Sequence, residues 1–185
     1  WNQGEFPFYY VQIAPYDYGR KNADKTEAAE IRQVQLECLK EIPNAGMVVT
    51  ADIGNRTCVH PSDKANVGKR LALWALAKTY QRSGTPYSGP LYKSFTIDKE
   101  KVVVEFDYAE MGMTSYDREI VGFEVAGKDG VYYPAKAVLF DNKTKVVLTS
   151  EQVPEPVGVK YGFRNYQPLN LFSNFGLPAS PFVAK

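Results

Sequence analysis

Residues 6–13 read FPFYYVQI, an uninterrupted apolar and aromatic run. A run of this kind is typical of a strand that is buried on both faces, as in a parallel sheet. Ala14-Pro15 ends the run, and a polar loop is expected over residues 16–24. Residues 47–50 (MVVT) predict a second short strand. A helix between two such strands makes a parallel βαβ unit.

Two helices are expected in this part of the chain. Over residues 26–41 and just beyond, apolar side chains recur at intervals of three and four, which predicts a helix that buries Ile31, Val34, Cys38 and Ile42. Pro43 and Asn44 stop this helix. The second helix is expected to have Ser62 as its cap and to end near Tyr80. One side of it carries Val67, Leu71, Trp74, Ala75 and Lys78.

The helical spacing disappears after Ser83-Gly84. From there, β-branched and aromatic runs alternate with turn residues, which predicts an antiparallel sandwich of short strands. These runs cover residues 91–97, 102–106, 119–125, 131–140, 146–150 and 157–166. Pro134 indicates an edge position or a bulge, and the apolar tail 169–185 is expected to pack without regular structure. The sequence therefore predicts an α/β region over 1–83 and an all-β region over 84–185.

Composition excludes several function classes. The 185 residues carry 22 basic and 21 acidic side chains, a balance that argues against nucleic-acid binding. No apolar run approaches the ~20 residues that span a membrane. The chain opens without Met or a signal-peptide pattern, and we interpret it as a mature or excised piece of a longer protein. Cys38, Cys58 and one histidine are too few for a structural zinc site, and buried free thiols are favoured over a Cys38–Cys58 disulfide. No cofactor is expected.

The stretch Asp52 to Pro61 (DIGNRTCVHP) holds the single histidine, His60. It follows a predicted strand and precedes a predicted helix. In parallel sheets, ligands and catalytic groups gather at such connections, which lie at the carboxyl ends of the strands. Position alone leaves His60 as either a catalytic residue or an ordinary surface histidine.

Several longer stretches narrow this choice. In order, they are GEFPFYYVQIAPY, GMVVTADIGN, His60-Pro61 followed by VGKRLALWALAKTY, then YSGPLY and GLPASPF. Together they resemble the C-terminal half of sialate O-acetylesterases, which are carbohydrate esterases of the SGNH hydrolase superfamily. The resemblance covers nearly the whole chain. It implies that residues 1–83 are the C-terminal piece of a flavodoxin-like hydrolase domain and that residues 84–185 form a β-sandwich domain.

The resemblance also implies a role for His60. In the family, a histidine followed by proline is the base that activates a serine nucleophile, and the pKa of imidazole suits that role. The serine and oxyanion blocks lie upstream in the family. Residues 1–5 (WNQGE) are similar to the serine motif, but Phe6 stands where the serine would be. We therefore expect this chain to lack the nucleophile and to be inactive alone. Its expected partners are an O-acetylated sugar substrate and the missing N-terminal part of the hydrolase domain, with no nucleic acid or membrane.

The acid that orients His60 is left open. SGNH enzymes usually place Asp three residues before the histidine, where this chain has Thr57, and several members have Asp where this chain has Cys58. Asp52 either turns towards the imidazole or holds the loop. A backbone carbonyl is the further alternative, which would leave a Ser-His dyad. A nucleophilic role for Cys58 is disfavoured because no oxyanion pattern accompanies it.

Two functional hypotheses follow. The first is the C-terminal fragment of a carbohydrate O-acetylesterase. The second is a non-catalytic carbohydrate-binding or structural β-sandwich module. Residues 164–166 (RNY) suit sugar contacts but are more often sheet surface or interface. Family resemblance implies a secreted, periplasmic or lysosomal location.

Overall fold

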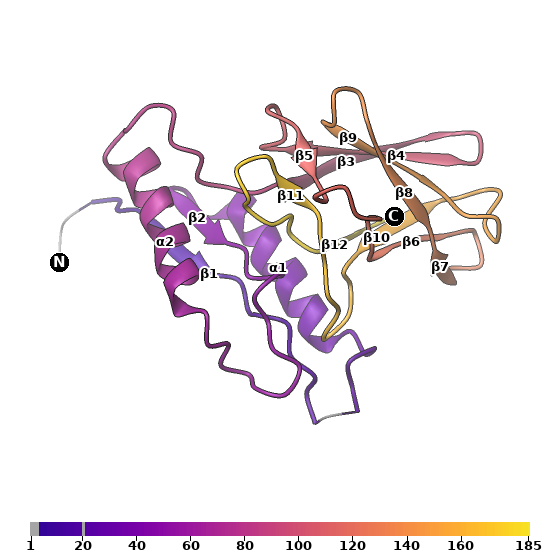
Figure 1. The fold of residues 1–185 in the computed structure, drawn as a ribbon, viewed down its shortest axis with the longest axis horizontal. Helices are drawn as coiled ribbons and strands as arrows, with labels where there is room; N and C mark the ends of the chain where they lie inside the picture. Colours follow the sequence, from indigo (N-terminus) through magenta and orange to yellow (C-terminus); the bar gives the residue numbers. More distant parts are fainter. Residues whose placement is uncertain (1–3, 20) are drawn as a thin grey trace.

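The computed structural model describes residues 4–19 and 21–185. Residues 1–3, the start of the stretch compared with the serine motif, lie outside the described residues. The chain is mostly β, with few helices (Figure 1). In chain order the elements are β1 (Phe8–Val11), α1 (Glu27–Glu41), β2 (Ala45–Val48), α2 (Lys64–Trp74), the π-helical turn η1 (Ala75–Thr79), β3 (Leu91–Asp98), β4 (Lys101–Asp107), β5 (Met113–Thr114), β6 (Phe123–Ala126), β7 (Tyr132–Pro134), β8 (Lys136–Phe140), β9 (Lys145–Thr149), β10 (Gly158–Tyr161), β11 (Phe172–Ser173) and β12 (Phe182–Ala184).

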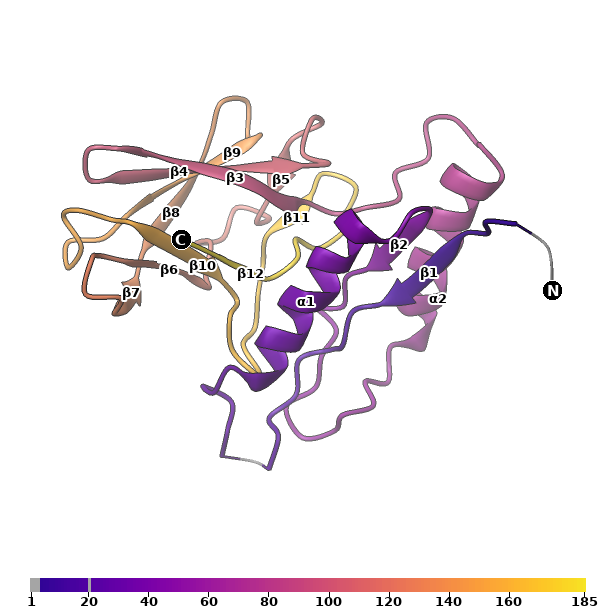
Figure 2. The same ribbon diagram turned by 180° about the vertical axis from the view of Figure 1, so that it is seen from behind.

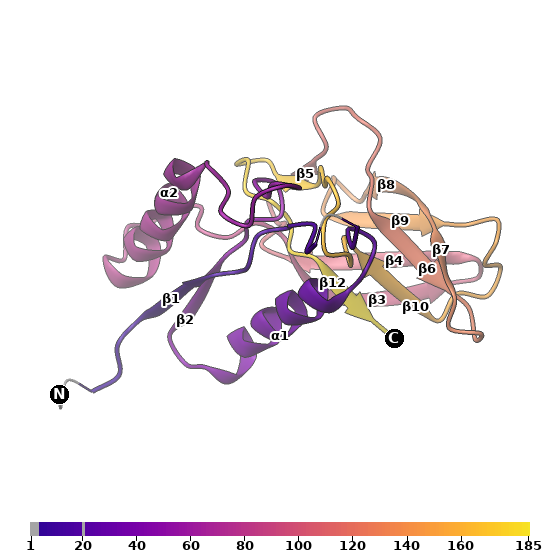
Figure 3. The same ribbon diagram turned by 90° about the horizontal axis from the view of Figure 1, so that it is seen from below.

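The first half contains the expected parallel pair of strands. β1 and β2 run parallel, with Phe8 opposite Ala45 and Val11 opposite Val48. The helices α1 and α2 lie on opposite faces of this pair (Figure 3). The prediction that residues 6–13 are buried on both faces is wrong, because Phe8 is 50% exposed. The physical reason is that β2 is the only strand neighbour of β1 among the described residues.

The predicted helix over 26–41 is present as α1, but the predicted buried side is wrong. Ile31 and Val34 are 52% and 58% exposed. The side that packs on the rest of the molecule instead carries Ala28, Ala29, Arg32 and Leu36. Small residues on that side allow the helix to pack closely, so the apolar row at three-and-four spacing faces outward.

The start of α2 also differs from the expectation. Its N-cap is Asp63 rather than Ser62, and the Asp63 carboxylate accepts a hydrogen bond from the Asn66 backbone N–H at 3.1 Å. The hydrogen bonds from Asn66 hold the pKa of Asp63 below its usual range. Near the end of α2, Trp74 is buried and its indole N–H donates to the Met47 carbonyl at 3.0 Å. This bond fixes α2 against β2.

The second half forms two four-stranded antiparallel sheets, with strand orders β12-β10-β6-β7 and β3-β4-β9-β8. Pro134 lies on the edge strand β7, in accord with its predicted edge position. The run over 131–140 is divided into β7 and β8. The expectation that the tail 169–185 lacks regular structure is wrong: it supplies β11, which pairs with β5, and β12, which completes a sheet beside β10.

The tail strand β12 also joins the two halves of the molecule. It lies beside α1 in both front and back views (Figures 1 and 2). Phe182 on β12 stacks on Tyr92 with ring centroids 4.4 Å apart and contacts Phe106 edge-on at 6.1 Å. The buried apolar residues form one cluster that extends from Leu36 and Met47 into both antiparallel sheets. Among the described residues, no helix has the length and apolar character required to cross a membrane.

Candidate active site

The loop that contains His60 leaves the carboxyl end of β2 and leads into α2. Its first part is anchored to the loop that follows β1, because the Asn55 backbone N–H donates to the Pro15 carbonyl at 3.1 Å. Gly54 lies so close to Pro15 that a Cβ at position 54 would be 2.4 Å from that carbonyl oxygen. Only glycine permits this approach. The loops after the two parallel strands are therefore fastened to each other.

Asp52 is bound to α2 rather than to the histidine. Its carboxylate accepts two hydrogen bonds from the Arg70 guanidinium, at 2.8 and 2.6 Å. The side chains of Arg70 and Asp52 are only 8% and 15% exposed. Arg70 also donates to the Val49 carbonyl at 2.8 Å. Bidentate pairs of this kind fix geometry as well as adding energy, so this ion pair fixes the start of the loop.

Asn55 organises the part of the loop just before His60. Its side-chain oxygen accepts hydrogen bonds from the backbone N–H groups of Thr57 and Cys58, at 2.8 and 3.1 Å. The Cys58 thiol in turn donates to the His60 carbonyl at 3.3 Å. His60 itself is exposed, whereas Pro61 is buried. His60 is thus exposed on a loop whose backbone is held by hydrogen bonds to Asn55 and Cys58.

A second ion pair holds the neighbouring loop. The Asp17 carboxylate is buried and lies 3.3 Å from the Arg56 guanidinium. It also accepts a hydrogen bond from the Asn22 backbone N–H at 2.7 Å. The loops that follow β1 and β2 are therefore joined by the Asp17–Arg56 ion pair as well as by the backbone hydrogen bond from Asn55 to Pro15.

Neither Asp17 nor Arg70 was singled out from the sequence. A charged residue on the buried side of a predicted amphipathic helix is the signal that would have found Arg70.

The other residues that the sequence singled out have structural partners. Asn165 is 1% exposed, and its side-chain oxygen accepts a hydrogen bond from the Ala28 backbone N–H at 2.8 Å. It therefore caps α1 from the far end of the chain, where Thr26 makes no side-chain cap. Arg164 forms ion pairs with Glu124 and Asp24. Both cysteines are free thiols, as favoured, but the prediction that they are buried is wrong: Cys38 is half-buried and Cys58 is exposed on the loop.

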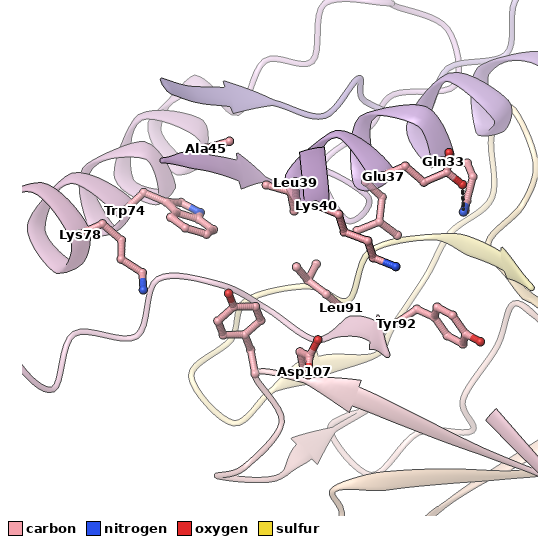
Figure 4. Close-up of a pocket in the computed structure, with 12 residues that line it drawn as sticks. Gln33, Glu37, Leu39, Lys40, Ala45, Trp74, Lys78, Leu91, Tyr92 and Asp107 are labelled. Carbon is pink, nitrogen blue, oxygen red and sulfur yellow. Dashed lines mark hydrogen bonds between the residues drawn. The ribbon is translucent and has the colours of Figure 1, made fainter. Parts of the chain in front are cut away.

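A cavity between the two halves of the molecule lies away from this loop. It has a volume of about 480 Å³ and is lined from α1, β2, α2, β3 and β4, including Ala45 at the amino end of β2 (Figure 4). Lys40 and Lys78 point towards it beside Trp74 and Asp107. Burial and the neighbouring Tyr87 raise the pKa of Tyr108 on its wall to about 12. Neither His60 nor Asp52 lines this cavity.

Within residues 4–19 and 21–185, no hydrogen bond joins the side chains of Asp52 and His60. The same residues contain no group of three or more His, Cys, Asp or Glu side chains that could hold a metal ion. The site is therefore one exposed imidazole on a loop that is fixed by Arg70, Asn55 and Pro15.

The chain resembles known proteins in both sequence and structure. No protein-family model matches the chain. The chain is 26% identical to the sialate O-acetylesterases of Mus musculus and Rattus norvegicus, over 97% of its own length and 36% of theirs. It also matches the crystal structure of a carbohydrate acetylesterase from Xanthomonas citri, with a TM-score of 0.88 and 34% identity. The chain is sialate O-acetylesterase-like. The resemblance seen in the motifs is thereby confirmed.

The esterase-like chain spans well under half of each of these relatives. It covers 36% of the rodent proteins and 41% of the Xanthomonas citri chain, while 97% of its own residues are matched. The shared segment therefore includes both the parallel strands and the antiparallel sheets. The relatives therefore contain further polypeptide outside the shared segment.

Proposed function

We propose that the chain is the C-terminal piece of a carbohydrate O-acetylesterase that acts on sialic acid or a related sugar. Residues 1–83 would form the end of a flavodoxin-like SGNH hydrolase domain, and residues 84–185 a β-sandwich domain. His60 would be the catalytic base. The observation that carries the proposal is the position of this histidine, exposed on a fixed loop at the carboxyl end of a parallel strand pair.

The proposed chemistry uses an acyl-enzyme. A serine oxygen from the missing part attacks the acetyl carbonyl, and the His60 imidazole takes the serine proton as the new C–O bond forms. The imidazole then gives that proton to the sugar oxygen as the ester bond breaks. Water attacks the acetyl-serine in the same way, and acetate leaves. Neither a metal nor a cofactor takes part in these steps.

Two roles were open to Asp52, and its partners favour one of them. Both carboxylate oxygens are bonded to Arg70. Asp52 then acts as a positioning residue that holds the loop. The tautomer of His60 would be fixed by a backbone carbonyl or by an acid from the missing part, which describes a Ser-His dyad or a triad completed elsewhere.

The chain alone is expected to be inactive, because a base without a nucleophile and oxyanion donors has nothing to activate. The test is p-nitrophenyl acetate turnover, corrected for the background of free imidazole. We expect no excess rate. A clear excess that a serine-directed covalent inhibitor abolishes would show a nucleophile in this chain and contradict the assignment.

The function itself is tested by reconstitution. The chain is mixed with the part of the Xanthomonas citri acetylesterase that it does not cover, here called the complementary part. The expected result is release of acetate from an O-acetylated sialic acid, and inhibition by the serine reagent. A mixture that binds the sugar without turnover would instead support the non-catalytic carbohydrate-binding module.

Location remains an inference from the family. An esterase of this kind would be secreted, periplasmic or lysosomal, where O-acetylated glycans occur.

A further inference from the structure

The cavity between the helical half of the molecule and the antiparallel strands has the size of a small-molecule site (Figure 4). Its volume is about 480 Å³, and such sites measure about 300–1,000 Å³. One wall comes from α1, β2, α2 and η1, and the opposite wall comes from β3, β4 and the residue after β4. The buried side chains of Leu36, Trp74 and Leu91 belong to its lining. The cavity therefore offers a ligand an apolar surface from both halves.

Charged side chains from both walls meet at this cavity. Lys40 and Lys78 point into it from the helical side, and Asp107 lies on the opposite wall (Figure 4). In the described part of the chain, none of these three side chains belongs to an ion pair. The Lys78 ammonium instead lies over the Tyr87 ring, 4.6 Å from its centroid. The cavity therefore has cationic donors on one wall and an anionic acceptor on the other.

Tyr108 lines the strand side of the cavity with a strained backbone. Its φ is 62°, in the left-handed region that bulky residues rarely adopt. Its ring meets the ring of Tyr87 edge-on, with centroids 5.5 Å apart, and Tyr87 meets Trp74 edge-on at 4.7 Å. Backbone strain of this kind persists where the surroundings impose it, and it clusters at active sites and ligand clamps. The strain at Tyr108 is thus a second indication of a binding site.

We propose that this cavity binds a saccharide unit of the glycan on which the proposed esterase acts. The apolar face of the sugar ring would pack on Trp74 and Tyr108. Sugar hydroxyls would accept hydrogen bonds from the ammonium groups of Lys40 and Lys78, and would donate to the Asp107 carboxylate. The proposal rests on the proposed function and deepens it, because it names a glycan-binding site that is formed wholly by this chain.

The charge balance of the lining favours a saccharide over an anion. The ammonium groups of Lys40 and Lys78 are matched by the carboxylates of Glu37 and Asp107. Glu37 already accepts a hydrogen bond from the Gln33 amide at 2.9 Å, which leaves Asp107 as the carboxylate without a protein partner. An anion would gain from an excess of positive charge, which this lining lacks. A hydroxyl both donates and accepts, so a sugar satisfies ammonium and carboxylate groups together.

The test measures binding of sialyllactose and lactose to the 185-residue chain by calorimetry and NMR, with citrate as the probe for an anion site. The test variant is Lys40→Ala with Asp107→Ala, which removes one charge of each sign from the cavity. The matched control is Lys136→Ala with Glu151→Ala, which removes one charge of each sign outside the lining. All four side chains are exposed, so both variants are expected to fold, which circular dichroism checks.

We expect both saccharides to bind the chain with a Kd of about 1 mM and to shift the amide signals of Tyr92 and Tyr108. The Lys40/Asp107 variant should bind at least tenfold more weakly, and the Lys136/Glu151 variant should bind unchanged. Saccharide binding that the Lys40/Asp107 variant leaves unchanged would overturn the proposal, as would no saccharide binding up to about 20 mM. Binding of citrate alone would overturn it in favour of an anion site.

The outcome is separable from that of the proposed function, whose measurement is turnover by the reconstituted enzyme. Turnover by a chain that binds neither saccharide would overturn this site and leave the proposed function standing. Saccharide binding that the Lys40/Asp107 variant weakens, in a reconstituted enzyme without turnover, would support the site and refute the proposed function. Saccharide binding that disappears when the complementary part is added would overturn the site, because the cavity would then be covered in the whole protein.

Discussion

The Asp52–Arg70 pair offers the sharpest test of how the His60 loop is held. Asp52→Ala leaves the Arg70 guanidinium, whose side chain is 8% exposed, with the Val49 carbonyl as its remaining partner. Removal of one member of a buried pair costs about 3–5 kcal/mol. Asp52 is 15% exposed, which places the expected loss at the lower end, about 3 kcal/mol. For a chain of 185 residues, this lowers Tm by roughly 6–12 °C.

The assay is urea unfolding of a double-mutant cycle. Arg70→Met keeps most of the side-chain volume without the charge, and the double variant Asp52→Ala/Arg70→Met leaves no unpaired guanidinium. We therefore expect the double variant to be more stable than Asp52→Ala alone, with a coupling energy of about 2 kcal/mol or more. An Asp52→Ala loss below about 0.5 kcal/mol would refute the reasoning, because exposed ion pairs give values of that size.

The same variant separates the two roles of Asp52 in the reconstituted enzyme. A positioning role predicts that kcat and KM change together with stability, and that Asp52→Asn recovers part of the loss by keeping one hydrogen bond to Arg70. A direct role in orienting the imidazole predicts a fall in kcat as large as that of His60→Ala, with KM unchanged.

Three further outcomes are expected from the free chain. Gly54→Ala should destabilise the chain by about 1–3 kcal/mol, because the new Cβ would be 2.4 Å from a backbone oxygen. Gly68→Ala, with open space around it in α2, should stabilise the chain by about 0.5–1 kcal/mol. Urea unfolding of both variants measures whether each free energy of unfolding falls or rises. Asn165→Ala should cost about 2–3 kcal/mol, since the buried amide satisfies the first turn of α1 from 137 positions away, and a loss within 0.5 kcal/mol would contradict the capping role. The hydrogen bonds of Glu27 with its own backbone amide and with Asn165 hold the pKa of its carboxylate below the usual range. Its contribution to stability is therefore present above the unfolded pKa and is lost as pH falls through the folded pKa. Glu27→Gln should lose less stability than the parent between about pH 5 and pH 3 in thermal melts, and equal slopes would count against this contribution.

The sequence identified the fold elements best where periodicity and turn residues agreed. The parallel pair with its helical crossover and most of the later strands lie where the runs of residues predicted them. The strands of the tail were not predicted, because Pro178 and Pro181 indicate irregular structure there. These short strands form by pairing with β5 and β10, which lie earlier in the chain. A strand of two or three residues has no pattern of its own and exists through its pairing.

The burial of α1 could not be predicted from its spacing alone. The three-and-four pattern correctly marked an apolar face, but the pattern does not say what that face contacts. The helix buries alanines and an arginine against the later strands, and the apolar row is left outward.

For the site, the sequence supplied His60 and its place after a strand, and it supplied both roles of Asp52. It did not supply Arg70 as the partner of Asp52, because a charged residue on the buried side of a helix does not identify the residue 18 positions away that it contacts. It also did not supply the contact of Gly54 with Pro15, which joins two loops that are 39 residues apart. Both depend on the way β1, β2 and α2 are packed.

The most direct test of the account is the effect of His60→Ala in the enzyme reconstituted from this chain and the complementary part. The measurement is kcat for acetate release from an O-acetylated sialic acid, with Cys58→Ala as the matched control on the same exposed loop. The account predicts a fall in kcat of at least ~100-fold for His60→Ala, with unchanged complex formation and folding, and nearly full activity for Cys58→Ala. A His60→Ala enzyme that folds, assembles and retains near-parent kcat would contradict the account, since the base would then come from the other part of the polypeptide.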